Sequence, residues 1–277
     1  MGAWLAGSVK VIHTLHGIHY LNYSNPVLRT MLISLERMLS KKSSAVICVS
    51  RTDRDRGLEN RLFNPETVHV IRNGVAAAGK ERIDSDDLRR ELSIGPECPV
   101  IINVARLHRQ KAQHTLIKAF ARVIEKIPEA RLMFVGDGPL RSSLEKQTAE
   151  LNLSQQVRFL GMKRQIQDYL AISDLFVLSS LWEGLPLSLL EAMSVGKPAV
   201  CTESDGISEI ITSGDDGILV PVEDSESMSE AIVYLLTNTA EAEKMGQRAK
   251  VKIQKQFDVH RMISETRALY TELRGQI

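Results

Sequence analysis

Cysteine is scarce in this chain of 277 residues. Cys48, Cys98 and Cys201 lie far apart without a Cys-x-x-Cys pair, which argues against a disulfide framework or a zinc ribbon. No apolar run approaches the ~18 residues of a membrane span. The first residues lack the basic segment of a signal peptide, and Ala6 stands where myristoylation needs Ser or Thr. We therefore expect a soluble, cytoplasmic protein.

An excess of charge of one sign is also lacking. The chain has 35 Lys and Arg against 34 Asp and Glu, a net charge of +1, so no basic field points to a nucleic-acid partner. Residues 1–95 carry 14 basic and 10 acidic side chains. This local excess is compatible with peripheral association at an anionic membrane surface, but an ordinary solvated surface often has the same balance.

The sequence does have an alternation of short apolar runs and amphipathic stretches. The apolar runs predict strands buried on both faces, at residues 9–14, 45–50, 68–72, 100–104, 132–135, 157–160, 175–178, 199–201 and 218–220. Helical patterns lie between them, for example at residues 114–127, and the last part is helical at about residues 225–236, 240–256 and 260–274. This alternation predicts an α/β fold with parallel sheets and helices on both faces.

A boundary is expected within residues 76–97, which combine small residues, a charged stretch and a Gly-Pro segment. Six strands follow it, enough for a complete doubly wound domain, whereas only three precede it. We therefore expect a partial Rossmann-like domain and linker at residues 1–95, a complete Rossmann-like domain at 96–258 and a final helix at 259–277.

Loops after strands are the first candidates for a site, because ligands bind beyond the carboxyl ends of an open parallel sheet. Arg106 and Lys111 follow the strand at 100–104 and suit a diphosphate, although basic loop residues more often face solvent. Gly136 and Gly138 follow the next strand, where a backbone without Cβ either approaches a ligand closely or simply turns tightly.

The most informative segment follows the seventh predicted strand. Pro186 suits the first turn of a helix, so the N–H groups of Leu187 and Ser188 would face an anion. Glu183, before this helix, and Glu191, inside it, are placed to reach ligand hydroxyls. The alternative is a surface glutamate and an early-helix glutamate favoured by the helix dipole.

His16 follows the first predicted strand and precedes Gly17. Its spacing from His13 suggests a metal site, but a strand leading into a loop points such side chains in different directions. Contact of His16 with a substrate is the better interpretation.

In their order along the chain these motifs resemble one family. Arg106…Lys111, Gly136-Asp-Gly-Pro139 and Glu183-x(7)-Glu191 are similar to the retaining glycosyltransferases of family 4 (glycosyl transferases group 1), which have the two-domain GT-B architecture. The resemblance runs through nearly the whole chain and includes Thr14-Leu-His16-Gly17, Ala45-Val-Ile-Cys-Val-Ser50, Val70-Ile-Arg-Asn73-Gly74-Val75, Leu160-Gly161 and Gly217-Ile-Leu-Val220.

The resemblance implies a role for each residue. Arg106 and Lys111 would neutralise the diphosphate of a nucleotide-sugar donor, a UDP-sugar by family habit, with GDP and ADP left open. Glu183 would contact the donor sugar, Glu191 the ribose, and His16 the sugar from across the cleft. The other donor-binding positions are expected at Asn73, Gly136, Gly138, Gly161, Met162, Gly184, Leu187 and Ser188.

The implied reaction is transfer of a hexosyl group with retention of the anomeric configuration, through same-face attack helped by the leaving phosphate. The acceptor would be a glycan or a lipid-linked intermediate of polysaccharide or cell-envelope biosynthesis at the inner face of a membrane. No metal or other cofactor is expected, because the cations and the helix start compensate the leaving diphosphate. The last helix would cross back onto the N-terminal half.

The sequence departs from the family pattern in two places. Ala112 follows Lys111 where the family usually has glycine. The sequence begins just before the His16 strand, so we also expect the βα units that precede this strand in the family to be absent. We therefore expect an incomplete acceptor half. Residues 1–75 would then be less stable than residues 96–277 unless a partner covers them.

Three other functions are compatible with parts of this pattern. A glycosidase also uses two carboxylates, but it does not need two cations and a helix start around a diphosphate. A nucleotide-sugar epimerase shares the architecture, whereas the Glu183-x(7)-Glu191 arrangement favours transfer. A truncated, non-catalytic subunit that only binds nucleotide sugar is the alternative from a different class.

Overall fold

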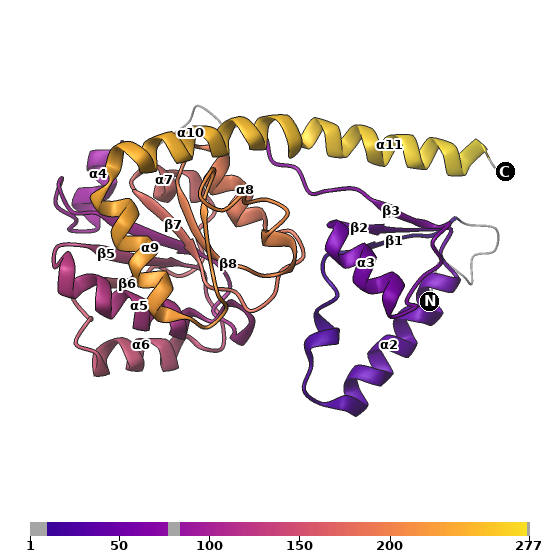
Figure 1. Cartoon of the computed structure of the whole chain (residues 1–277), viewed down its shortest axis with the longest axis horizontal. Helices are drawn as coiled ribbons and strands as arrows, with labels where there is room; N and C mark the ends of the chain where they lie inside the picture. Colours follow the sequence, from indigo (N-terminus) through magenta and orange to yellow (C-terminus); the bar gives the residue numbers. More distant parts are fainter. Residues whose placement is uncertain (1–9, 77–83, 276–277) are drawn as a thin grey trace.

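The structure of the chain is a computed structural model that describes residues 10–76 and 84–275. Within these ranges the chain forms two halves, each built around its own parallel sheet (Figure 1). The N-terminal half has three strands and the C-terminal half has six. Among the described helices, none combines the length and the apolar character that crossing a membrane requires.

The N-terminal half is a small sheet with two principal helices. Its strands lie in chain order and are β1 (Ile12–Leu15), β2 (Ala45–Cys48) and β3 (Val68–Val70). They are connected by the 3-10 helix η1 (His19–Asn22) and by α2 (Pro26–Lys41) and α3 (Arg51–Glu59). Both α-helices begin at a capping side chain, because Asn25 accepts two backbone N–H groups of the first turn and Ser50 accepts one.

The C-terminal half is a six-stranded sheet in the order β6-β5-β4-β7-β8-β9, with every neighbouring pair parallel. The strands are β4 (Val100–Val104), β5 (Arg131–Val135), β6 (Val157–Phe159), β7 (Leu175–Leu178), β8 (Ala199–Thr202) and β9 (Ile218–Val220). The chain runs outward from β4 to β6 and then continues on the other side of β4 with β7. In such sheets ligands bind where the strand order reverses, so the carboxyl ends of β4 and β7 define the expected site.

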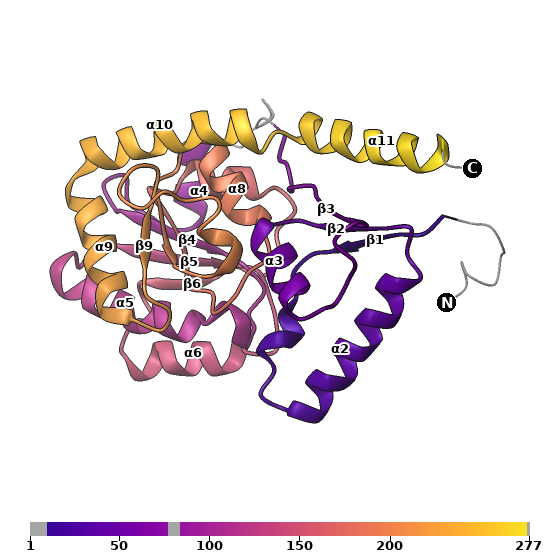
Figure 2. The ribbon, with the colours of Figure 1, turned by 45° about the vertical axis from the view of Figure 1, so that its right-hand side comes forward.

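Helices cover both faces of this larger sheet (Figure 2). One face packs mainly against α5 (Gln113–Lys126), α6 (Arg141–Glu150) and α9 (Ser225–Thr237). The other packs against α4 (Ser85–Glu91), α7 (Ile166–Ala171), α8 (Leu187–Ser194) and α10 (Thr239–Gln256). Strands β4, β7 and β8 are buried throughout, which explains their mainly apolar sequences.

The last helix, α11 (Val259–Gly275), returns to the N-terminal half. Figures 1 and 2 both show α10 and α11 nearly end to end along one side of the molecule. The buried side chains of Leu269 and Leu273 pack in one cluster with Ala45, Ile47 and Ile71. The C-terminal segment therefore completes the core of the small sheet.

The structure confirms the α/β fold class and all nine predicted strands, with ends that differ by up to three residues. Val9, the first residue of the first predicted strand, lies outside the described residues. The predicted charged stretch of the linker needs a correction. It contains α4, whose Leu88 is buried against the C-terminal half and whose Arg89 donates hydrogen bonds to the carbonyls of Cys98 and Ile172. Residues 77–83 of that stretch are also outside the description.

Candidate active site

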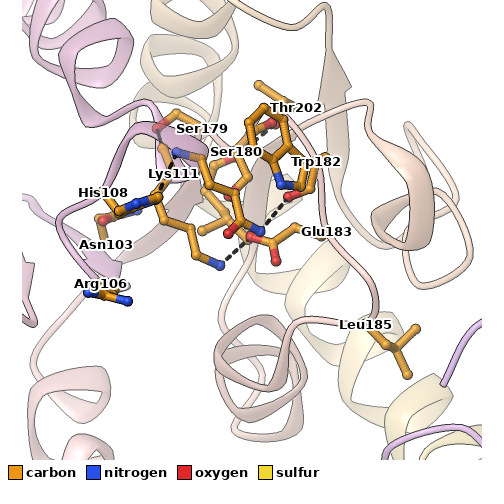
Figure 3. A network of polar contacts seen from close by, with 12 residues as sticks. Asn103, Arg106, His108, Lys111, Ser179, Ser180, Trp182, Glu183, Leu185 and Thr202 are labelled. Carbon is orange, nitrogen blue, oxygen red and sulfur yellow. Dashed lines mark hydrogen bonds and ion pairs between the residues drawn. The ribbon is translucent and has the colours of Figure 1, made fainter. Parts of the chain in front are cut away.

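A buried ion pair lies between the ends of β4 and β7. The Lys111 ammonium, from the loop after β4, is 2.5 Å from Glu183 Oε1, from the loop after β7. The same oxygen accepts a hydrogen bond from Ser180 Oγ at 2.6 Å. Figure 3 shows these side chains turned toward one another, with the carboxylate between them. Glu183 is only 6% exposed, so its charge depends on these two partners.

Backbone contacts fix the position of Lys111. The lysine ends the short helix η2 (Arg109–Lys111), and Ser179 Oγ donates a hydrogen bond to its carbonyl. Ala112 then takes a left-handed conformation with φ of 45°, the region that glycine adopts most easily. This positive φ is consistent with the glycine that the resemblance leads us to expect there, and Ala112 adopts it in this chain.

A second pair of contacts joins the two loops. Gln110 Nε2 donates a hydrogen bond to the Trp182 carbonyl, and Leu181 N donates one to the Gln110 carbonyl. Beneath them, Asn103 Nδ2 binds the Val177 carbonyl, and Thr202 Oγ1 binds the Ser180 carbonyl. This buried network holds the Lys111–Glu183 pair at a fixed distance from the sheet (Figure 3).

Arg106 lies in the same loop as Lys111, but it is exposed. Its carbonyl accepts a hydrogen bond from Gln113 Nε2, which fixes the backbone and leaves the guanidinium free to turn toward a ligand. In Figure 3 it lies on the far side of Lys111 from Glu183. The structure therefore places the two predicted cations in one loop, with only Lys111 already paired.

Helix α8 begins beside Glu183 and carries Glu191. Its first residue follows Pro186, and no side chain of the described residues caps it, so the N–H groups of Leu187 and Ser188 remain available to a ligand. Glu191 lies one turn further and is half-buried. Burial raises the pKa of its carboxyl group. The predicted helix start is thus present and points its partial positive charge at the loop.

The predicted glycines Gly136 and Gly138, in the loop after β5, allow close packing against the neighbouring loop. A Cβ atom on Gly136 would lie 2.0 Å from the Ala105 carbonyl oxygen, and one on Gly138 would lie 2.3 Å from that of Leu107. These glycines let the loop after β5 pack on the loop that carries Arg106. Gly136 N also donates to the Gly161 carbonyl, and the neighbouring Met162 is 84% exposed.

The N-terminal half meets the site at the loop after β1. A Cβ atom on Gly184 would lie 2.8 Å from the His16 carbonyl oxygen, and one on Gly206 would lie 1.4 Å from the Gly184 carbonyl oxygen. Backbone therefore packs directly on backbone, across the two halves at Gly184 and within the C-terminal half at Gly206. The His16 side chain itself is exposed at this contact. We call the contact between His16–Gly17, Gly184 and Gly206 the glycine seam.

Three residues that sequence reasoning missed position this loop or lie beside it. Asp53, on α3, accepts hydrogen bonds from Ile18 N and Ser50 Oγ. Burial raises the pKa of Asp53, and these hydrogen bonds oppose the shift. His19 lies against Gly17, and burial lowers its pKa although the charge of Glu183 acts in the opposite direction. Neither residue stands in a recognisable motif.

The third missed residue, Glu209, joins the halves at the start of α3. Its Oε1 accepts Thr52 N at 2.7 Å and Thr52 Oγ1 at 2.9 Å, and its Oε2 lies 3.1 Å from Arg72. Predicted Asn73 acts nearby, because its Nδ2 donates to the Leu185 carbonyl at 3.0 Å. Asn73 therefore supports the loop that follows Glu183.

The arrangement combines two cations, an uncapped helix start and two glutamates at the point where the strand order reverses. Cations and free N–H groups suit a phosphate group, and buried carboxylates suit hydroxyl groups. Within residues 10–76 and 84–275, no three histidine, cysteine, aspartate or glutamate side chains lie together as metal ligands would.

Known proteins match both halves. Residues 84–252 match the family model described as glycosyl transferases group 1, and residues 1–78 match the one described as glycosyltransferase family 4. The UDP-Gal:alpha-D-GlcNAc-diphosphoundecaprenol alpha-1,3-galactosyltransferase of Escherichia coli is 29% identical, over 99% of this chain and 72% of that protein. The N-acetyl-alpha-D-glucosaminyl L-malate synthase of Bacillus anthracis is also 29% identical, over 96% of this chain and 68% of that protein.

Solved structures share the fold. Anabaena HepE, solved in complex with UDP and glucose, aligns with a TM-score of 0.87 at 23% identity, over 97% of this chain and 73% of that one. Sucrose-phosphate synthase from Thermosynechococcus elongatus aligns with a TM-score of 0.87 at 23% identity, over 100% and 71%. One family model covers more than half of the chain, and the fold agrees. The chain therefore belongs to the glycosyl transferases group 1 family and is a glycosyltransferase with the two-domain GT-B fold.

Proposed function

We propose that this glycosyltransferase moves a hexosyl group from a UDP-sugar to a glycan or lipid-linked acceptor, with retention of the anomeric configuration. The observation that carries the proposal is the Lys111–Glu183 pair beside the uncapped start of α8, at the reversal of the strand order. Support for UDP comes from the E. coli relative, whose name includes a UDP-Gal donor, and from the HepE structure with UDP and glucose. The same relative's name includes a diphosphoundecaprenol acceptor.

In this proposal the donor lies along the carboxyl edge of the larger sheet. Arg106 and Lys111 neutralise its diphosphate together with the N–H groups at the start of α8. Glu183 accepts hydrogen bonds from the sugar hydroxyls, and Glu191 accepts them from the ribose. The segment of Gly161 and Met162 borders the base, and His16 approaches the sugar from the N-terminal half.

The reaction needs no protein nucleophile. The acceptor hydroxyl attacks the anomeric carbon on the face that the diphosphate leaves, so the new C–O bond forms where the old one breaks. The acceptor proton passes to an oxygen of the departing phosphate. Lys111, Arg106 and the α8 N–H groups stabilise the negative charge that develops on the diphosphate, and for this reason we propose metal-independent transfer.

We also propose that three segments of the chain have different roles. Residues 1–95 would provide the acceptor side, residues 96–258 the donor side, and residues 259–277 the helix that ties the halves together. The acceptor would be a polysaccharide or cell-envelope intermediate at the inner face of a membrane, with peripheral association of the protein. A partner that covers part of the N-terminal half is compatible with this arrangement.

Calorimetric titration with UDP, GDP and ADP in the absence of metal tests the donor site. We expect micromolar binding of UDP that is lost in the Arg106→Ala/Lys111→Ala variant. The matched control is Arg109→Ala, which removes an exposed cation from the same loop and should bind as the unchanged chain does. Absence of binding by the folded chain would overturn the donor assignment. Binding of UDP-sugar without transfer to any acceptor would favour a non-catalytic subunit.

A further inference from the structure

A cavity of about 210 Å³ lies where α3, the end of β3 and the junction of α10 and α11 meet. Figures 1 and 2 both show the segment after β3 running to this junction. Four arginines line the cavity, from the start of α3, the segment after β3 and the first turn of α11, namely Arg51, Arg54, Arg72 and Arg261. The acidic side chains of the lining are Asp258 and Glu265, which leaves a net charge of +2. We call this space the arginine cavity.

Two of the arginines are held by carboxylates that do not line the cavity. Arg72 Nη2 donates a hydrogen bond to Glu209 Oε2 at 3.1 Å, and the guanidinium lies 5.5 Å from the centre of the Phe257 ring. Arg54 Nε donates to Asp55 Oδ1 at 2.8 Å. A guanidinium has five N–H groups, so these contacts orient both arginines and still leave donors for a ligand.

The other two arginines have more donors to offer. Within the described residues, the exposed guanidinium of Arg51 has neither a hydrogen bond nor an ion pair. Arg261 uses only its Nε, which donates to Glu265 Oε1 at 2.8 Å. The second carboxylate of the lining also has a partner, because Asp258 Oδ1 accepts His260 N at 3.3 Å. The arginine cavity therefore has an excess of N–H donors over acceptors.

The chemistry and the size of the cavity indicate the class of ligand. The planar fork of a guanidinium matches the oxygens of a phosphate group and binds two of them at once. A volume of about 210 Å³ is below the roughly 300–1,000 Å³ of pockets for larger ligands, so a whole nucleotide sugar does not suit it. Phe257 and Met262 add apolar surface beside the arginines, where a short carbon skeleton could lie.

We propose that the arginine cavity binds a small phosphate-bearing anion, either free phosphate or a phosphate monoester, and that binding stiffens the joint between the two halves. None of the residues assigned to the donor lines this cavity. The site is therefore separate from the proposed donor site, and the inference does not depend on the proposed function.

The joint itself borders the cavity. Its two chain segments pair there, because Val75 N donates to the Phe257 carbonyl at 2.9 Å and Val259 N donates to the Val75 carbonyl at 3.2 Å. A Cβ atom on Gly74 would lie 2.6 Å from the Asp258 carbonyl oxygen, so the segments touch through backbone. Phe257 and Asp258 belong both to this pairing and to the cavity lining. A ligand stabilises the conformation that forms its site, so the bound anion favours the paired joint.

Calorimetric titration of the full chain with inorganic phosphate and with glucose 6-phosphate, at constant ionic strength, tests the binding. We expect saturable binding at submillimolar concentration. The Arg51→Gln/Arg261→Gln variant should bind at least tenfold more weakly, because it removes the two guanidinium groups that have the most free donors. Tighter binding of the sugar phosphate would identify a monoester as the ligand, and tighter binding of inorganic phosphate would identify the free ion.

Two variants serve as controls. Arg158→Gln/Arg267→Gln removes two exposed arginines that do not line the cavity and should bind phosphate as the unchanged chain does. Arg106→Ala/Lys111→Ala alters the proposed donor site and should also keep this binding. Hydrogen exchange at the Val75 and Val259 amides should become slower when phosphate is added, and this effect should be lost in Arg51→Gln/Arg261→Gln.

Three results would overturn the proposal. One is a folded chain without saturable phosphate binding. Another is binding that Arg106→Ala/Lys111→Ala abolishes and Arg51→Gln/Arg261→Gln retains, because the phosphate would then occupy the donor site. The third is exchange at the Val75 and Val259 amides that bound phosphate does not change, since the anion would then have no effect on the joint.

Discussion

At the scale of single residues, the site depends on one carboxylate with two partners. Glu183 Oε1 accepts hydrogen bonds from both Lys111 Nζ and Ser180 Oγ, and the residue is almost completely buried. A buried carboxylate is tolerated because both partners neutralise or hydrogen-bond it. In the proposed reaction Lys111 must turn from this carboxylate toward the diphosphate. Without a donor, the ammonium and the carboxylate therefore neutralise each other.

The Glu183→Gln variant separates the proposed contact of Glu183 with the donor sugar from its ion pair with Lys111. The amide keeps the shape of the side chain but removes the charge that holds Lys111. We expect transfer to fall about 100-fold, the usual scale for losing one polar contact that the transition state needs. The affinity for UDP should stay equal or increase, since the lysine is free to bind phosphate. Initial rates and calorimetric titration measure the two effects.

The exposed Glu203, in the loop after β8, provides the control as Glu203→Gln. This variant should change neither the rate of transfer nor the affinity for UDP. Loss of UDP affinity in Glu183→Gln that parallels the loss of rate would contradict the assignment of Glu183 to the sugar.

Gly184 illustrates how little room the glycine seam leaves. A methyl group on Gly184 would lie 2.8 Å from the His16 carbonyl oxygen, which is backbone and cannot turn aside. We therefore expect Gly184→Ala to push the loop after β1 away and to lower kcat/KM at least tenfold. Hydrogen exchange at residues 16–18 should become faster. Gly275→Ala, where nothing lies within 4 Å, is the control, and equal rates in both variants would argue against the seam.

The sequence predicted the charged residues of the site better than the residues that hold them. Lys111, Glu183 and Glu191 stand in an ordered pattern after apolar strands, so their positions follow from the strand–helix alternation. Asp53 and Glu209 act through contacts with Ile18 and Thr52, which are 35 and 157 residues away in the chain. No local pattern encodes such contacts, because they depend on the tertiary arrangement, within the N-terminal half for Asp53 and between the two halves for Glu209.

At the scale of elements, prediction succeeded where burial dictated the sequence. Strands β4, β7 and β8 are covered on both faces, and their mainly apolar sequences were sufficient evidence. Helix α4 was missed because only Leu88 among its seven residues is buried, so its sequence looks like a charged linker. Helix α2 has the opposite property, since five of its apolar side chains are exposed.

The contact between His13 on β1 and Glu36 on α2 should depend on pH. The hydrogen bond from His13 to Glu36 raises the pKa of the imidazole, and burial opposes this shift. A raised histidine pKa contributes stability that is fully present below the unfolded-state value, about 6.5, and is lost as pH rises through the folded-state value. We expect protection of the α2 amides to decrease above about pH 6.5.

Hydrogen exchange at several pH values, corrected for the intrinsic rate, measures this protection. His13→Gln removes the titrating group and should give a flat profile. A pH dependence that survives in His13→Gln would assign the effect to another group.

At the scale of the whole molecule, the two halves are joined at a small number of points. Val49, at the end of β2, packs in the core of the C-terminal half, and α11 packs in the core of the N-terminal half. The polar contacts between the described residues of the halves include the ion pair of Arg56 with Asp205, the hydrogen bond of Asn73 to the Leu185 carbonyl, and the contacts of the Glu209 carboxylate at the start of α3. Glu209 occupies a position that an anion would favour, since it receives N–H groups at a helix N-terminus.

Glu209 should therefore stabilise the contact between the two halves. Burial alone would raise its pKa, but the hydrogen bonds from Arg51, Thr52 and Arg72 outweigh burial and hold the pKa below its usual value. A lowered carboxyl pKa contributes stability that is present above the unfolded-state value and lost as pH falls through the folded-state value. The contact should thus weaken only in acid, below about pH 4.3, the usual value for glutamate.

Glu209→Gln removes the contact at neutral pH. We expect a larger radius of gyration in solution scattering and about tenfold slower transfer, the change that ~1.4 kcal/mol produces. The affinity for UDP should change little, because the residues proposed to bind its diphosphate, ribose and base lie in the C-terminal half. Glu230→Gln, at an exposed position of α9, should leave all three quantities unchanged. If Glu209→Gln lowers UDP affinity as much as it lowers the rate, Glu209 acts on the donor site and not on the joint between the halves.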